Sequence, residues 1–82
     1  MELPPNRIEE LREEAEMPRA ALAVTCGVGE MTIRRWEKGD SKVDDDQKFA
    51  MARELTRRLG REVSPEFLMG WDRIPAGTGE AA

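Results

Sequence analysis

Apolar residues recur along the chain at helical spacing, in short stretches separated by glycine and proline. Ile8, Leu11 and Ala15 fall at positions i, i+3 and i+7, which predicts one apolar stripe on a first helix. No stretch alternates apolar and polar residues with a period of two, as a half-buried strand would. The pattern therefore predicts an all-α domain, with Asn6 capping the first helix and Glu9 completing a capping box.

Proline and glycine mark the ends of the next two helices. Pro18 ends the first segment and suits the first turn of a second helix, which Gly27 closes. A third helix is predicted from about residue 30 to residue 38, with Gly39 as its C-terminal stop. The inward positions of these two helices are apolar or small: Leu22, Ala23, Cys26, Ile33 and Trp36.

The last third of the chain predicts two more helices. Asp44 and Gln47 form a second candidate capping box, and Gly60 closes the helix that they open. Ser64 and Pro65 start a short fifth helix that carries Phe67 and Leu68. We expect a flexible segment at 1–5, one domain over 6–72 and a disordered tail at 73–82. The apolar stripe of the fourth helix is predicted to comprise Phe49, Ala52, Leu55 and Leu59.

Length and composition narrow the functions that the chain can have. Its 82 residues allow one domain with a small core. Histidine is absent and there is one cysteine, so we expect no zinc site, no cofactor and no enzymatic activity. The sequence has no apolar run that could cross a membrane and no signal peptide, which favours a cytoplasmic protein without a membrane partner.

The junction between the second and third helices predicts a steep crossing. Ala23, Gly27 and Val28 lie between Leu22 and Ile33. A tight turn between two helices needs glycine, and a close crossing needs a small side chain such as alanine. The segment RAALAVTCGVGEMTIRRWE resembles the helix-turn-helix of the phage repressor and Cro family, also called the Xre type, and the resemblance extends from about residue 6 to residue 71.

The resemblance implies a five-helix, lambda-repressor-like domain in which residues 18–38 form the helix-turn-helix and the third helix enters the major groove of DNA. Arg19 stands where the family has a glutamine that contacts the DNA backbone, and Lys48 where it has a core leucine. The implied base contacts are Glu30, Met31, Thr32 and Arg35, and the implied backbone contacts are Arg19, Arg34, Lys38 and Lys42.

The family also implies an ion pair and a dimer. Arginine of the first helix pairs with glutamate at the end of the third, which indicates Arg12 and Glu37 here. The family often dimerises through its last helix, which makes a patch of Phe67, Leu68 and Trp71 the candidate dimer surface, although these side chains could also cover the core.

Simpler structural roles compete with the DNA contacts. Arg34 and Arg35 could simply form a solvated helix face. Alternatively, the guanidinium group of Arg35 could bridge guanine O6 and N7. Glu30 could complement the helix dipole or accept from cytosine N4. Met31 suits a thymine methyl group, and Thr32 suits phosphate as well as a base.

Charge is unevenly distributed along an acidic chain with 13 Lys+Arg and 17 Asp+Glu. Residues 19–43 hold five basic and three acidic side chains and have a net positive charge, whereas residues 1–18 and 44–82 are each net negative. Asp44, Asp45 and Asp46 follow it at a helix start, where carboxylates favour the dipole but would repel phosphate.

The resemblance implies a transcriptional regulator, of the phage-type repressor kind, that binds a double-stranded DNA operator. It would read an inverted repeat as a homodimer and be associated with the nucleoid of a bacterial or phage-infected cell. The rival hypothesis is a protein-interaction module or antitoxin on the same fold that uses its acidic faces to bind a protein partner.

Overall fold

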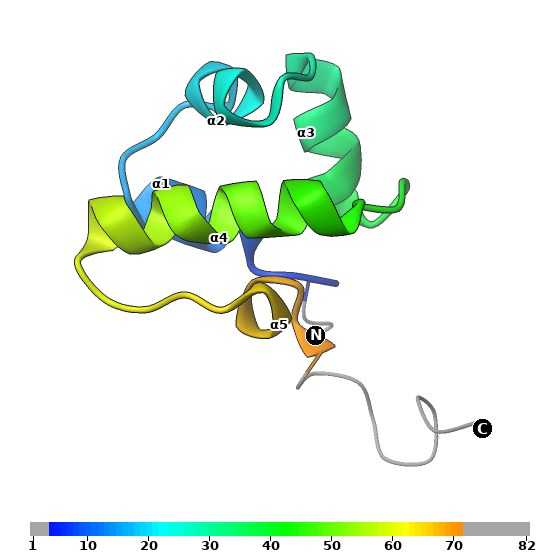
Figure 1. The fold of residues 1–82 in the computed structure, drawn as a ribbon. Helices are drawn as coiled ribbons and strands as arrows, with labels where there is room; N and C mark the ends of the chain where they lie inside the picture. The colour runs from blue at the N-terminus through cyan, green and yellow to red at the C-terminus, as the bar shows by residue number, and fades with distance from the viewer. Residues whose placement is uncertain (1–3, 72–82) are drawn as a thin grey trace.

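The computed structural model describes residues 4–71, which fold into five helices without strands (Figure 1). The predicted all-α class and the number of helices are confirmed, whereas the tail predicted at 73–82 lies outside the described residues. The helices are α1 (Ile8–Glu14), α2 (Arg19–Cys26), α3 (Glu30–Lys38), α4 (Asp45–Leu59) and α5 (Pro65–Leu68).

Glycines end three of the helices as the sequence predicted. Gly27, Gly39 and Gly60 follow α2, α3 and α4 in the left-handed conformation, with φ of 70°, 78° and 71°. A side chain at such a position would be strained, because the Cβ atom approaches the following carbonyl oxygen. The end of α1 was not predicted at its actual place, since Glu16 adopts φ 58° two residues before Pro18.

The two predicted capping boxes are not formed. Asn6 precedes the N-cap of α1, which is Arg7, although its Oδ1 atom accepts a hydrogen bond from the Ile8 amide at 3.1 Å. Asp44 occupies the N-cap of α4 but its side chain accepts no capping hydrogen bond. Ser64 does cap α5, because its hydroxyl oxygen accepts from the Phe67 amide at 3.1 Å.

One core contains side chains from all five helices and from the loops that join them. Ile33, Leu22 and Trp36 are buried as predicted. The predicted stripe of α4 is wrong at one edge: Phe49 is 58% exposed, and Met51 is fully buried in its place. The buried apolar side chains are Ile8, Leu11, Met17, Leu22, Ala23, Ile33, Trp36, Val43, Met51, Ala52, Leu55, Val63 and Leu68.

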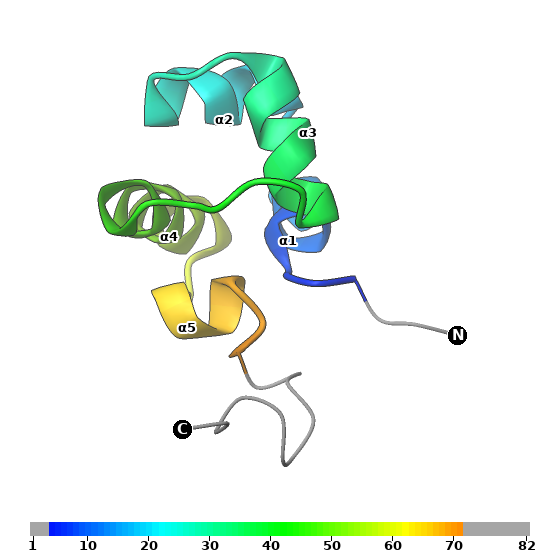
Figure 2. The same ribbon diagram turned by 90° about the vertical axis from the view of Figure 1, so that its right-hand side faces the viewer.

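The arrangement of the helices places α3 on one side of the molecule and α5 on another. Figure 1 shows α2 and α3 above α4, with α3 running steeply to α2, and α5 below α4. In Figure 2 the N-terminal segment passes from α1 between the end of α3 and α5. No other helix of the described residues covers the side of α3 that turns away from α2 and α4.

Candidate nucleic-acid interface

A tight turn holds α3 at its angle to α2. The Val28 amide donates to the Ala23 carbonyl oxygen at 3.0 Å, and the Gly27 amide donates to that of Val24 at 3.2 Å. These bonds satisfy carbonyl groups that the last turn of α2 would otherwise leave without partners. Gly29 is the N-cap of α3 and provides no side-chain cap. The start of the helix therefore depends on packing, to which the buried Ile33 contributes.

The outward face of α3 carries a stripe with helical spacing. Met31, Arg34, Arg35 and Lys38 follow one another at i, i+3, i+4 and i+7, and all four are exposed. Met31 is 60% exposed, which leaves a large apolar side chain in water near the start of the helix. Glu30 is also exposed and Thr32 is partly buried, so the predicted base-contacting side chains all reach the surface of the first turns of α3.

The cations without an anionic partner concentrate on this face. Among residues 4–71, seven lysines and arginines lie within 4.0 Å of a carboxylate oxygen. The five that form no such pair are Arg34, Arg35, Lys38, Lys42 and Arg53, and four of these lie on α3 or on the loop that follows it. A neighbouring carboxylate cancels much of a cation's field, so most of the unpaired positive charge of residues 4–71 lies on α3 and the loop after it.

Glu37 lies on the opposite side of α3 and ties the helix to α1. Its Oε2 atom accepts a hydrogen bond from Arg12 Nε at 2.8 Å, and the two side chains are only 3% and 8% exposed. Arg12 Nη1 also donates to the Met17 carbonyl oxygen at 2.9 Å. The structure thus contains the ion pair that the family resemblance implied, and Glu37 adds no free negative charge to the outward face.

Arg19 is the second partner of Glu37, which the sequence did not predict. Its Nε atom donates to Glu37 Oε1 at 2.8 Å, and its Nη2 atom lies 3.6 Å from Glu9 Oε2. The hydrogen bond and the charge of Glu37 raise the pKa of Arg19. Arg19 remains partly exposed at the start of α2, but any contact with phosphate has to share the guanidinium with these carboxylates.

The aspartates after α3 begin α4. Asp44 precedes the helix, and Asp45 and Asp46 lie in its first turn, where negative charge opposes the positive end of the helix dipole. Asp45 lies 3.4 Å from Lys48 Nζ, whereas Asp46 is exposed and forms no ion pair within the described residues. The Lys48 side chain is largely buried, at the position where the family has a core leucine, although its ammonium group is charged.

Cys26 is a partly buried thiol that packs against the core. Burial raises its pKa from 9.0 to about 11, because an apolar environment disfavours the thiolate. The thiolate is the nucleophilic form, so this side chain has a packing role at neutral pH.

Cys26 should make stability depend on pH above neutrality. Its folded pKa exceeds its unfolded value, so its contribution is present below pH 9 and is lost as the pH rises toward about 11. Denaturant unfolding of the wild type and of Cys26→Ala at pH 8, 9, 10 and about 11 measures the effect. The wild type should lose more stability than Cys26→Ala over this interval, and parallel losses would contradict the assigned cause.

Aromatic side chains gather on and beside α5. The Arg7 guanidinium carbon lies 3.9 Å from the centroid of the Phe67 ring, and Lys48 Nζ lies 5.0 Å from that of Trp71. Phe67 and Trp71 are exposed, but Leu68 is fully buried. Leu68 therefore cannot belong to a dimer patch, because it is a core residue of the monomer.

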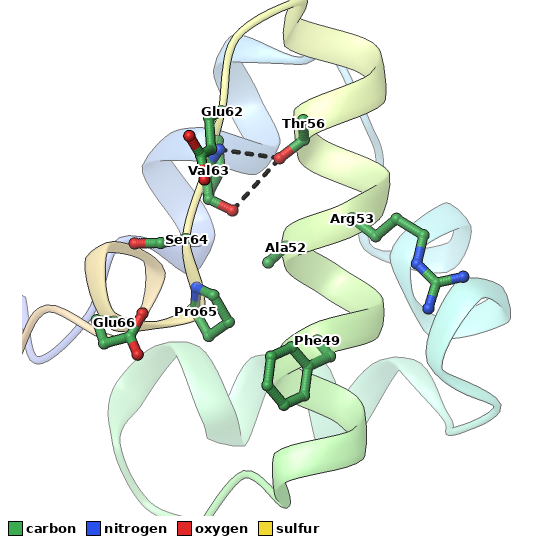
Figure 3. Close-up of a pocket in the computed structure, with 9 residues that line it drawn as sticks. All are labelled: Phe49, Ala52, Arg53, Thr56, Glu62, Val63, Ser64, Pro65 and Glu66. Carbon is green, nitrogen blue, oxygen red and sulfur yellow. Dashed lines mark hydrogen bonds between the residues drawn. The ribbon is translucent and has the colours of Figure 1, made fainter.

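A surface pocket of about 570 Å³ lies between α4 and residues 62–66 (Figure 3). Phe49 stands at one end, and Thr56 closes the other by exchanging two hydrogen bonds with the backbone of Val63, at 2.9 and 3.3 Å. The exposed Phe49 thus lines this pocket, where the sequence had placed it in the core.

The turn between α2 and α3, the buried inner side of α3 and its cationic outer stripe together define a helix-turn-helix domain. A family model described as helix-turn-helix matches residues 8–64. The chain belongs to this helix-turn-helix family, the Xre type of the Cro and phage repressor proteins. The fold is that of DNA-binding transcription regulators. No curated protein and no solved structure matches the chain.

Two further findings concern the described residues only. Their helices are too short or too polar for any of them to span a bilayer. Residues 4–71 contain no group of three or more cysteine, aspartate and glutamate side chains placed to hold a metal ion.

Proposed function

We propose that the protein is a sequence-specific DNA-binding regulator, of the phage-repressor kind, that reads an inverted repeat as a dimer. The observation that carries this proposal is the stripe on α3: its cations have no carboxylate partner, whereas most cations elsewhere in the described chain are paired. Outside α3 and the loop after it, Arg53 is the one lysine or arginine among residues 4–71 without such a partner.

The side chains near the start of α3 read the bases in this proposal. Arg35 bridges O6 and N7 of a guanine, and Met31 contacts a thymine methyl group, because the apolar side chain is exposed where the helix would enter the groove. Glu30 accepts from cytosine N4, and Thr32 contacts the adjacent base or phosphate. Arg34, Lys38 and Lys42 contact phosphates and set the register of the protein on the duplex.

Arg19 has a double role in the proposal. Its Nε atom already bonds Glu37, so only the remaining guanidinium hydrogens are available to phosphate. The contact would still be well oriented, since the carboxylate restricts the rotation of the side chain. We expect about three phosphate contacts for each subunit from Arg34, Lys38 and Lys42, with Arg19 as an additional one.

The dimer surface in this proposal comprises Phe67 and Trp71, without Leu68. Both side chains are exposed and lie on or directly after α5, and aromatic residues are enriched in the cores of protein interfaces. We call α3 the recognition helix. A dimer has two of them, and they would read half-sites about one turn of the DNA helix, ~34 Å, apart.

Selection of bound fragments from a random DNA pool, followed by salt titration of the best sequence, tests the function. The selected sites should share an inverted repeat. The logarithm of the affinity should fall with the logarithm of salt at a slope of about −5 for six phosphate contacts in the dimer, or about −7 if Arg19 adds one contact in each subunit. Failure to enrich any sequence, together with no binding at low salt, would favour the rival in which the fold binds a protein.

Asp46 should weaken binding to DNA. Replacing it by Asn removes one unpaired negative charge from the first turn of α4. The Coulomb energy between two unit charges 8 Å apart in water is about 0.5 kcal/mol, so a phosphate at that distance would give roughly a twofold change in affinity for each subunit. Band-shift titrations at low and high salt should show the gain at low salt only, because counterions screen exposed charges.

The matched control is Glu62→Gln, which makes the same change of charge beyond the other end of α4. Glu62 is exposed and follows a helix of 15 residues, about 22 Å long. An equal gain from both variants would mean that only net charge matters, and would contradict a local effect of Asp46.

A further inference from the structure

The backbone of residues 5–7, here called the N-terminal strap, connects the end of α3 to the end of α5. Asn6 is buried and lies at its centre. Its Nδ2 atom donates to the Trp36 carbonyl oxygen at 2.7 Å, and its Oδ1 atom accepts from the Ile8 amide at 3.1 Å. One amide group therefore joins the last turn of α3 to the first turn of α1.

Pro5 lies against the glycine that ends α3. A Cβ atom added to Gly39 would lie 3.0 Å from Pro5 Cγ and 3.2 Å from Pro5 Cβ, which is closer than side chains ordinarily approach. Glycine at this position therefore serves two needs, the left-handed turn with φ 78° and the close approach of the strap.

Arg7 makes the corresponding contacts with α5. Its amide donates to the Leu68 carbonyl oxygen at 2.8 Å, and its Nη1 atom donates to the Phe67 carbonyl oxygen at 2.8 Å. The guanidinium also lies over the Phe67 ring. These bonds satisfy carbonyls at the C-terminal end of a helix that has only four residues and depends on its surroundings for stability.

We propose that Asn6 and Arg7 are positioning residues that fix the recognition helix relative to the α5 surface. The two residues are consecutive, so their Cα atoms lie about 3.8 Å apart across one rigid peptide unit. Asn6 is hydrogen-bonded to α3 and Arg7 to α5. A movement of α5 is therefore transmitted to the end of α3. This inference rests on the proposed function, because in a dimer formed through Phe67 and Trp71 that geometry sets the separation of the half-sites.

The mechanical part of the proposal can be tested on the free protein by residue-resolved amide exchange. Asn6→Ala breaks the strap at α3, and the reporter is the Arg7 amide, whose partner is on α5. Loss of one buried hydrogen bond should speed its exchange by about tenfold relative to amides in the middle of α4. An increase confined to the Ile8 and Gly39 amides would overturn the proposal, because the two ends would then move independently.

Two glycine variants provide a matched pair for the same measurement. Gly39→Ala and Gly60→Ala impose the same strain on a left-handed residue, but only the first meets Pro5, since nothing lies within 4 Å of an added Cβ at Gly60. Exchange at Arg7 should increase in Gly39→Ala and not in Gly60→Ala, relative to mid-α4 amides. Equal responses would also overturn the proposal.

Binding to operators with altered spacing tests the consequence for DNA. The selected half-site is placed in inverted repeats with the central spacing changed by one or two base pairs in either direction. Wild type should prefer one spacing by about tenfold or more, whereas Asn6→Ala should retain its affinity for a single half-site and lose most of that preference. An unchanged preference would overturn the proposal, while absence of half-site binding by the wild type would instead reject the proposed function.

Discussion

Replacing Glu37 by Ala should lower the free energy of unfolding by about 3–5 kcal/mol, the cost of breaking a buried ion pair on one side. Arg12 would keep its charge in a site where its side chain is only 8% exposed, and its Nε atom would lose its acceptor. Arg19 would lose the acceptor of its own Nε atom. Urea unfolding monitored by helical circular dichroism measures the change.

The comparison is with Glu13→Ala, which removes the same charge from an exposed position on α1. Surface substitutions away from special features change stability by about 0.5 kcal/mol or less. Glu37→Gln gives a further check, because it retains an acceptor oxygen for one arginine but not for both, and should fall between the two. Equal midpoints for Glu37→Ala and Glu13→Ala would mean that the buried pair contributes nothing to folding.

The ends of the helices were predictable because their signals are local. A glycine after a periodic segment can adopt the left-handed conformation that ends a helix, and Gly27, Gly39 and Gly60 do so. The side chains that hold α3 were also predictable, since Ile33 and Trp36 stand at helical spacing in an otherwise polar segment. For these features the sequence contains the whole physical cause.

The register of α4 was not predictable in full, because two stripes share most of their members. Ala52, Leu55 and Leu59 fit a stripe that includes either Phe49 or Met51. The prediction placed Phe49 on the stripe, but tertiary packing buries Met51 and leaves the Phe49 ring at the edge of the pocket. Spacing alone cannot decide between neighbouring positions at the edge of an apolar face.

Contacts between distant residues account for the features that the sequence did not predict. Asn6 and Trp36 are 30 residues apart, and Arg7 and Phe67 are 60 apart. No local pattern distinguishes these bonds from a helix cap, which is the role that the sequence suggested for Asn6. Likewise, Arg19 appeared free for DNA until the fold brought it to Glu37. The burial of Leu68 could not be predicted either, because a helix of four residues is too short to show a periodic pattern of apolar positions.

Arg35→Ala should abolish discrimination at one base pair of each half-site. A bidentate contact between arginine and guanine contributes about 1–3 kcal/mol of discrimination, or roughly five- to 150-fold. The side chain is exposed and has no carboxylate partner among the described residues, so its loss should not disturb the fold. The measurement is the affinity of wild type and variant for a set of operators in which each base pair is replaced in turn.

Lys42→Ala is the control because Lys42 is also exposed and unpaired but lies on the loop after α3. A phosphate contact carries no direct sequence information, so this variant should weaken binding to every operator alike and reduce the salt slope by about one unit for each phosphate that the lysine neutralises. Wild type and Lys42→Ala should then show the same base preferences, while Arg35→Ala should tolerate all four bases at a single position. Uniform weakening by both variants would place Arg35 on the phosphate backbone and leave Met31 and Glu30 as the side chains that read sequence.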